Sequence, residues 1–169
     1  MNNYFSKMRG GAALPPQPAL RLIAIAWLGG FLAISAVGLL TDVSSTPLVL
    51  GSFGATCVML FGFPDLPFSQ PRNVIGGHFI STLTGLAFLS VFGPHWWSMA
   101  MALGTASALM LLTRTVHPPA GSNPVIVMLS LPGWQFLFTP TLLGAIIVVT
   151  IAVLYNNLIK ERTYPKYWL

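Results

Sequence analysis

The sequence predicts an all-α membrane protein of about six transmembrane segments, arranged as a 3+3 inverted repeat with two broken half-helix segments. Three observations predict this fold: a shortage of charge, a series of apolar runs, and prolines and glycines that interrupt two of those runs. Only 7% of the 169 residues are charged, whereas 54% are hydrophobic. A soluble domain carries roughly 25% charged residues, so this chain requires a lipid bilayer around most of its surface.

Six apolar runs follow one another along the chain, and a spanning helix needs about 20 apolar residues. We expect a cytoplasmic N-terminal tail over 1–20, one transmembrane helical domain over 21–159 and a cytoplasmic C-terminal tail over 160–169. The runs cover residues 21–40, 47–63, 74–92, 96–113, 122–131 and 135–158.

The positive charges predict the orientation of these runs. If all six cross and the N-terminus is cytoplasmic, every Lys and Arg falls on the cytoplasmic side, as the positive-inside rule requires. Four crossings would place Arg72 and Arg114 outside, so six are favoured. The pattern predicts an inner (plasma) membrane protein with both termini in the cytoplasm. Because topology explains the net charge of +5, we expect no nucleic acid partner.

The two halves of the chain look related. Residues 51–60 (GSFGATCVML) resemble residues 121–129 (GSNPVIVML) with a one-residue gap, and 82–85 (TLTG) resemble 141–144 (TLLG). Shared composition is the alternative explanation, because Gly, Val and Leu are common throughout the chain. Three crossings per half would give the halves opposite orientations, which is the inverted repeat of many transporters.

The fifth run gives the clearest sign of a broken helix. Pro118, Pro119 and Pro124 cannot donate backbone hydrogen bonds, so we expect extended chain followed by a helix that starts near Ser122 as its N-cap. From there to Leu131 the helix spans about 15 Å, half of the ~30 Å hydrocarbon core. Irregular backbone at that depth is tolerated only inside protein or beside a water-filled cavity.

By the repeat, the second run also breaks, so two half-helices would meet near mid-membrane with both N-termini pointing inward. Their amides and dipoles favour an anion there. The two intramembrane histidines could donate to that anion or shuttle a proton. The structural alternatives are neutral histidines bonded to backbone carbonyls and glycines that only allow close packing. The predicted substrate-binding residues are Gly51, Ser52, Phe53, Gly54, His78, His117, Gly121, Ser122 and Asn123.

A second polar group lies at the cytoplasmic ends of the runs. Its arginines could anchor the topology, or they could attract anions to a vestibule. No ligand cluster predicts a metal, no nucleotide motif predicts a cofactor, and no nucleophile–base arrangement predicts an enzyme. The predicted vestibule residues are Ser69, Gln70, Arg72, Asn73 and Arg114.

Residues 117–124 (HPPAGSNP) resemble the marked segment of the HPP family of integral membrane proteins. Residues 68–78 (FSQPRNVIGGH) and 51–55 (GSFGA) are similar to that family's other marked segments. The resemblance covers residues 20–160, and Ser122 departs from it because the family more often has alanine there. It implies nitrite transport, the activity associated with plastid and cyanobacterial members. Descriptions of the family often count four transmembrane helices rather than six.

Together these observations predict a membrane channel or transporter for a small monovalent anion, which the resemblance identifies as nitrite. The expected partners are the lipid bilayer, a small inorganic anion and further copies of the chain in a homo-oligomer. One alternative is a pore for a small neutral solute such as ammonia, urea or water. Another is a non-transporting membrane scaffold or sensor subunit, which would have a filled core without a polar cavity.

Overall fold

The structure is a computed structural model that describes residues 4–168, and within this range it contains six α-helices and no strand. The outermost residues of the two predicted tails, 1–3 and 169, lie outside the described residues. The helices are α1 (Leu20–Ser44), α2 (Gly51–Cys57), α3 (Pro71–Phe92), α4 (Trp96–Leu112), α5 (Asn123–Ser130) and α6 (Leu143–Asn157).

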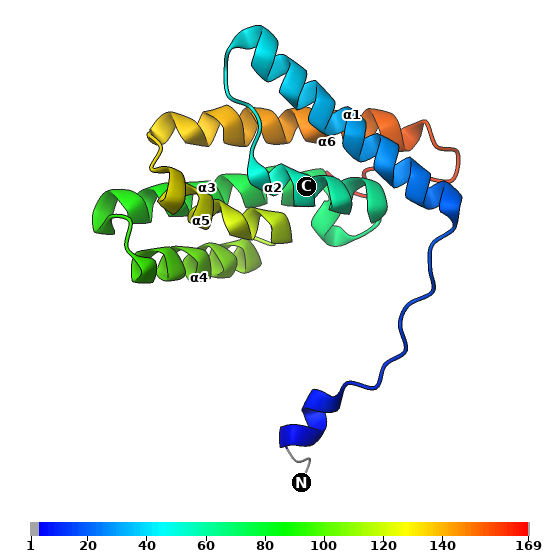
Figure 1. Ribbon diagram of the computed structural model, residues 1–169, viewed down its shortest axis with the longest axis horizontal. Coiled ribbons are helices and arrows are strands. Elements are labelled where there is room, and N and C mark those ends of the chain that lie inside the picture. The colour runs from blue at the N-terminus through cyan, green and yellow to red at the C-terminus, as the bar shows by residue number, and fades with distance from the viewer. Residues whose placement is uncertain (1–3, 169) are drawn as a thin grey trace.

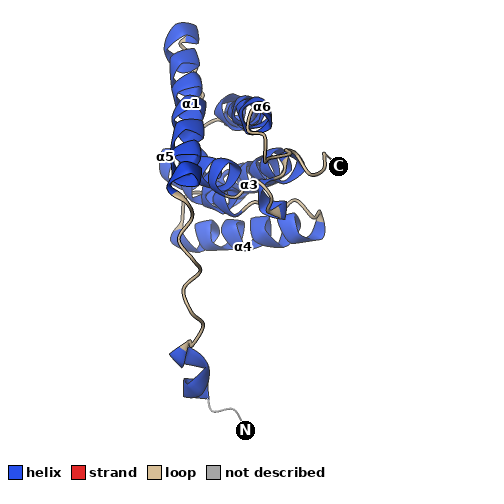
Figure 2. Ribbon diagram, turned by 90° about the vertical axis from the view of Figure 1, so that its right-hand side faces the viewer, coloured by secondary structure: helices blue, strands red, loops and turns tan. Residues whose placement is uncertain are grey.

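Three stretches are long and apolar enough to cross a membrane: Leu20–Ser44, Pro71–Phe92 and Trp134–Asn157. The prediction of an all-α membrane protein is therefore confirmed, while the inverted repeat stays a prediction. α1 lies at the edge of the bundle, beside α6 and across α2 (Figures 1 and 2). Large apolar side chains remain exposed on the outer surface, as a lipid-facing surface requires, and examples are Trp27, Leu112 and Leu129.

Side-chain contacts show which helix ends share one end of the bundle. The Arg21 guanidinium, at the start of α1, forms an ion pair with Glu161, which follows α6. Arg72, at the start of α3, donates a hydrogen bond of 3.1 Å to the carbonyl oxygen of Thr113, which follows α4. The start of α1 and the end of α6 therefore lie on the same side, as expected for two tails in one compartment. We call this end of the molecule the basic end.

The two shortest helices begin beside the middle of α3. Ser81, midway between Pro71 and Phe92, donates a hydrogen bond of 2.6 Å to the carbonyl oxygen of Ala120, just before α5. The Phe53 ring, in the first turn of α2, packs edge-on against the His78 imidazole of α3 with centroids 5.1 Å apart. From there α2 runs towards the basic end and α5 runs the opposite way (Figure 1).

The local structure before α5 differs from the prediction. Pro118–Ser122 form a 3-10 turn rather than extended chain, and α5 begins at Asn123. The fixed φ of the two prolines suits this tight turn, so the chain coils as soon as the prolines begin. Ser122 holds the N-cap position of α5, as predicted, but its side chain does not cap the helix, because its backbone is already helical and its hydroxyl donates to the carbonyl oxygen of Pro119.

Glycines on one face of α3 allow the broken segment to lie directly against that helix. A Cβ atom at Gly77 would lie 2.8 Å from the Cβ of His117, and one at Gly85 would lie 2.9 Å from the Cα of Pro124. Contacts this short do not occur between real side chains, so only glycine permits this approach. α3 is thus the support against which the interrupted segment is held.

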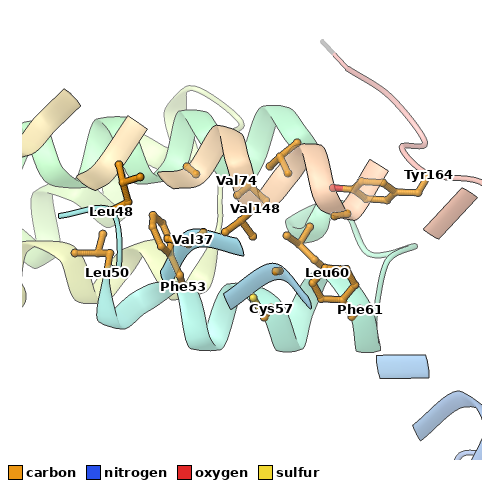
Figure 3. Packing of buried hydrophobic residues seen from close by; sticks show 14 residues of the cluster. Val37, Leu48, Leu50, Phe53, Cys57, Leu60, Phe61, Val74, Val148 and Tyr164 are labelled. Atoms are coloured by element: carbon orange, nitrogen blue, oxygen red, sulfur yellow. The ribbon is translucent and has the colours of Figure 1, made fainter. Parts of the chain in front are cut away.

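An apolar core joins α2 to α1 and α6. Figure 3 shows Phe53 of α2, with Leu60 and Phe61 of the helical turn that continues α2, packed with Val37 of α1 and Val148 of α6. Within a bilayer the surrounding lipid is as apolar as these side chains, so van der Waals packing rather than water exclusion holds this contact together. Val74 of α3 belongs to the same cluster, so the core also holds α2 beside α3.

Candidate functional site

A row of buried polar residues, joined by hydrogen bonds between their side chains, lies where the two short helices begin. We call Thr56, Thr82, His78, His117 and Asn123 the polar centre. Each of these side chains is 0% exposed. They come from α2, α3, the segment before the 3-10 turn and the first residue of α5, so the centre exists only when all these parts pack together.

The position of the proton on a neutral His117 follows from its two neighbours. Its Nδ1 lies 2.7 Å from the carbonyl oxygen of Phe68, which can only accept a hydrogen bond. Nδ1 therefore carries the hydrogen, and Nε2 is bare when the ring is neutral. Nε2 lies 2.9 Å from Oγ1 of Thr56, so the hydroxyl donates to it.

The proton on His78 is assigned in the same way. Nδ2 of Asn123 lies 3.0 Å from Nδ1 of His78 and donates a second hydrogen bond of 2.8 Å to Thr82. Because an amide nitrogen only donates, Nδ1 of His78 accepts and Nε2 carries the hydrogen. Nε2 lies 3.0 Å from Oγ1 of Thr56 and donates to it. The hydrogen bonds thus run in one direction, from Asn123 through His78 and Thr56 to His117.

Two buried polar atoms beside the polar centre have no hydrogen-bond partner among the described residues. They are Oγ of Ser52, on a side chain 3% exposed, and Oδ1 of Asn123. Native proteins rarely leave buried polar atoms unpaired unless a water or a ligand meets them. Both atoms belong to residues predicted to bind substrate.

The structure divides the predicted substrate-binding residues into two groups. Ser52, Phe53, His78, His117 and Asn123 are buried and lie in or beside the polar centre. The others lie on the outer surface, where α2 and the 3-10 turn are in contact; Gly121 is partly exposed, and Gly51, Gly54 and Ser122 are exposed.

Sequence reasoning missed Thr56 and Thr82. Each lies four residues after a predicted site residue, Ser52 and His78 respectively, and such residues share one face of a helix. Thr82 also stands in the TLTG segment of the suspected repeat, and its hydroxyl lies 3.3 Å from that of Thr141 in the matching TLLG segment. Helical spacing from the predicted residues would have identified both threonines.

Most predicted vestibule residues take part in structural contacts. Oγ of Ser69 donates to the carbonyl oxygens of Met59 and Phe63, and Nδ2 of Asn73 donates to that of Val116. Nε2 of Gln70 donates to the carbonyl oxygens of Pro64 and Leu66. Arg72 is half-buried and Arg114 is exposed, both at the basic end.

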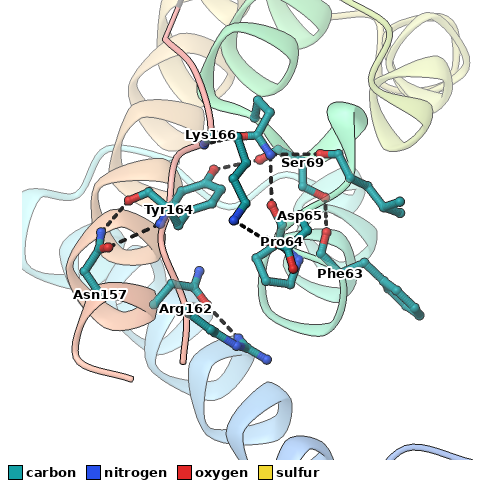
Figure 4. Close-up of polar contacts among 11 residues, drawn as sticks. Phe63, Pro64, Asp65, Ser69, Asn157, Arg162, Tyr164 and Lys166 are labelled. Atoms are coloured by element: carbon teal, nitrogen blue, oxygen red, sulfur yellow. Dashed lines mark hydrogen bonds and ion pairs between the residues drawn. The ribbon is translucent and has the colours of Figure 1, made fainter. Parts of the chain in front are cut away.

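The C-terminal segment packs over this loop (Figure 4). The Tyr164 hydroxyl donates to the carbonyl oxygen of Ser69 at 2.7 Å, and the Lys166 amide donates to Oε1 of Gln70 at 2.7 Å. Asn157 bonds to the Tyr164 backbone through both atoms of its amide. Burial raises the pKa of the Tyr164 phenol. We call Ser69, Gln70, Asn157 and Tyr164 the end cluster.

The fold and the polar centre define a class of protein: a multi-pass α-helical membrane protein with two segments interrupted around a buried hydrogen-bonded core. Within the described residues, no group of three or more His, Cys, Asp or Glu side chains could hold a metal. The chain belongs to the HPP transmembrane family, since the family model described as "HPP, transmembrane region" matches residues 15–165.

Two transmembrane proteins of Dictyostelium discoideum are similar to this chain. One is 34% identical over 98% of this chain and 63% of its own length, and the other is 33% identical over 98% and 57%. The chain therefore spans about three fifths of the length of these curated relatives. No solved structure matches it.

Proposed function

We propose that the protein transports a small monovalent anion, nitrite first among the candidates, through the polar centre. The observation that carries the proposal is the buried, unpartnered hydroxyl of Ser52, which lies beside two interrupted helices. The Ser52 hydroxyl can donate to an anion oxygen. The positive end of the α5 dipole, at Asn123, adds to the attraction.

The charge distribution supports entry of an anion from the basic end. Arg72 and Arg114 lie there, where they raise the local concentration of anions. At the polar centre, beyond the basic end, the proposed anion path has no arginine or lysine. A bound anion would therefore depend on hydroxyl, imidazole and backbone dipoles alone, or on a positive charge carried by a histidine.

Purified protein in liposomes tests the proposal. We expect nitrite to enter faster than into empty liposomes, and we expect His117→Ala to lower the rate by about tenfold or more, equivalent to roughly 1.4 kcal/mol. Leu154→Ala changes an exposed side chain of α6 and should leave the rate near that of wild type. Equal entry into empty and protein-containing liposomes, with other small anions and neutral solutes also excluded, would refute transport. Wild-type rates in His117→Ala would refute the placement of the path.

One observation favours a second candidate, a pore for a small neutral solute. Oδ1 of Asn123 can only accept a hydrogen bond, so its natural ligand carries an N–H or O–H group, as ammonia, urea and water do. Liposome swelling with urea or ammonia discriminates the two. Rapid swelling with nitrite excluded would select the neutral-solute pore over the anion pathway.

The orientation and assembly are also proposals. We propose that the basic end faces the cytoplasm, since Arg21, Arg72 and Arg114 mark it.

We propose that a second copy of the chain covers the outer face at Gly54 and Ser122, because hydrocarbon does not tolerate irregular backbone at mid-membrane depth. In a Cys57→Ser background, oxidation should cross-link Gly54→Cys into dimers and leave Leu154→Cys on α6 monomeric. The reverse pattern would refute this interface.

A further inference from the structure

We propose that Thr56, His78 and His117 form a binding site for one proton, which is taken up at Nε2 of His117. The proton site itself stands on the geometry of the polar centre. Its role in transport rests on the proposed function, and the two parts are tested separately below.

When both imidazoles are neutral, every hydrogen bond among these three side chains pairs one donor with one acceptor. The Thr56 hydroxyl has one hydrogen and two lone pairs, and it faces three groups: Nε2 of His117 at 2.9 Å, Nε2 of His78 at 3.0 Å and the carbonyl oxygen of Ser52 at 3.1 Å. The bare Nε2 of His117 requires a donor, so the hydroxyl turns its hydrogen to His117. It accepts from His78 at the same time.

One added proton is accommodated by rotation of a single hydroxyl group. When Nε2 of His117 is protonated, it donates to Thr56. Both lone pairs of the Thr56 oxygen are then filled, by His117 and His78, and its hydrogen turns to the carbonyl oxygen of Ser52. No donor is left facing a donor, and no heavy atom has to move. Thr56 therefore acts as a two-position switch between a neutral and a singly charged centre.

A second proton does not fit in the same way. It would have to bind Nδ1 of His78, which faces the donating amide nitrogen of Asn123. The amide would have to turn over and give up its bond to Thr82. Two positive rings would then lie with centroids 5.1 Å apart in a buried site. The arrangement is thus specific for one proton.

No fixed charge faces the two imidazoles from the elements packed around them. On α2 the nearest ionisable group is the buried thiol of Cys57, and on α3 it is Arg72 at the basic end. α4 and α5 carry no ionisable side chain, and Arg114 lies beyond the end of α4. The three carboxylates of the chain are exposed, in loops or near helix ends, and they are Asp42, Asp65 and Glu161.

The absence of a buried carboxylate among these described elements has a consequence for transport. A proton on His117 creates a positive charge that no protein group neutralises, and a buried unpaired charge is costly. A monovalent anion beside the Ser52 hydroxyl would neutralise it. The proton and the anion therefore favour each other's binding, and we expect one proton to cross with each anion in an electroneutral step.

Nitrogen NMR tests the proton site without any transport. Protein labelled with ¹⁵N-histidine in lipid bilayers is titrated with acid down to the pH at which the fold is lost, and signals are assigned with His78→Gln and His117→Gln. We expect Nε2 of His117 to change from a bare to a protonated nitrogen while His78 keeps its neutral pattern. The exposed His95 serves as the internal control. Protonation of His78 first, or of neither buried ring, would overturn the proposal.

Proteoliposomes with an internal pH dye test the coupling. Thr56→Val keeps the shape of the side chain without the hydroxyl, and Thr56→Ser keeps the hydroxyl as the matched control. We expect wild type and Thr56→Ser to bring in about one proton per nitrite, and Thr56→Val to lose at least tenfold of this proton uptake. Nitrite entry in wild type without proton entry would refute the coupling alone. Absence of nitrite entry would refute the proposed function and leave the NMR result standing.

Discussion

The polar centre and the end cluster are both buried and hydrogen-bonded, yet they differ in the kind of partner that each side chain has. In the end cluster, Ser69, Gln70 and Tyr164 bond to backbone groups, whose donor and acceptor roles cannot change. In the polar centre, Thr56 lies between two imidazoles, whose roles depend on where the protons are. Fixed partners hold a loop in one shape, whereas exchangeable partners can hold a proton.

The same contrast appears in how complete the hydrogen bonding is. Oε1 and Nε2 of the Gln70 amide are both bonded, whereas Oδ1 of the Asn123 amide is not. A buried side chain that is fully bonded has no capacity for a ligand. The comparison teaches that burial and polarity alone do not distinguish a candidate binding site from a structural cluster, and that unpaired atoms together with exchangeable donor and acceptor roles are the features that set the polar centre apart.

The largest expected effect is that of Gly77→Ala. The new Cβ would lie 2.8 Å from the Cβ of His117 and 2.9 Å from the carbonyl oxygen of Thr115, so the segment that carries His117 has to move. We expect nitrite uptake to fall to the level of empty liposomes and the free energy of unfolding to drop by roughly 3 kcal/mol, the upper end of overpacking costs.

Gly104→Ala on α4 is the matched control, because a Cβ there meets nothing within 4 Å. Thermal unfolding in detergent should show it to be at least as stable as wild type, since alanine favours helix over glycine. If both substitutions were equally harmless, α3 would not position the polar centre by close contact.

Gln70→Ala should weaken the end cluster, and it removes none of the hydrogen bonds made by the side chains of the polar centre. It removes two hydrogen bonds to backbone carbonyls and one from the Lys166 amide. We expect a loss of about 2 kcal/mol in stability, since each bond is worth about 1 kcal/mol net and part of the loss is recovered by water. Nitrite uptake per folded molecule should stay at the wild-type rate. A loss of uptake in fully folded protein would place Gln70 on the path after all.

Tyr164→Phe sharpens the comparison with a smaller change. It removes the hydroxyl that donates to the carbonyl oxygen of Ser69 and keeps the buried ring. We expect a loss of about 1 kcal/mol, the ordinary net value of one hydrogen bond. Chemical unfolding in detergent measures it, and an unchanged midpoint would show that the C-terminal segment does not hold the loop.

The smallest effect belongs to Glu161→Gln, at the exposed ion pair with Arg21. The hydrogen bond from Arg21 lowers the pKa of Glu161, so the pair stabilises the fold above the unfolded pKa and the contribution is lost as the pH falls through the folded value. Because both groups are exposed, we expect only a slight change in unfolding temperature, which added salt removes. A large, salt-resistant shift would contradict this description.

The class of fold was accessible from the sequence because lipid imposes a simple compositional rule. Few charges, apolar runs of spanning length and prolines between them sufficed to predict a helical membrane protein and to locate both interruptions. The geometry at Ser122 was not accessible, because the Pro118–Pro119 pair is compatible with both extended chain and a 3-10 turn. Only packing against α3 distinguishes the two.

The candidate site was predictable in part. His78, His117 and Asn123 could be identified because ionisable and amide groups are rare inside a membrane. Thr56 could be placed on the same helix face as Ser52 by its spacing, but its link between the two histidines could not be predicted, because it depends on three neighbours that only the fold brings together. The predicted vestibule includes Ser69 and Gln70, whose partners in the C-terminal segment follow them by about 95 residues and are invisible to local patterns.

The most direct test compares nitrite uptake by liposomes that carry wild type, Asn123→Leu or Tyr164→Phe, each normalised to folded protein. We predict that Asn123→Leu, which removes the amide that donates to His78 and Thr82 in the polar centre, reduces uptake to the level of empty liposomes. Tyr164→Phe, which changes only the end cluster, should take up nitrite as fast as wild type. Equal rates in all three would contradict the claim that solute passes through the polar centre.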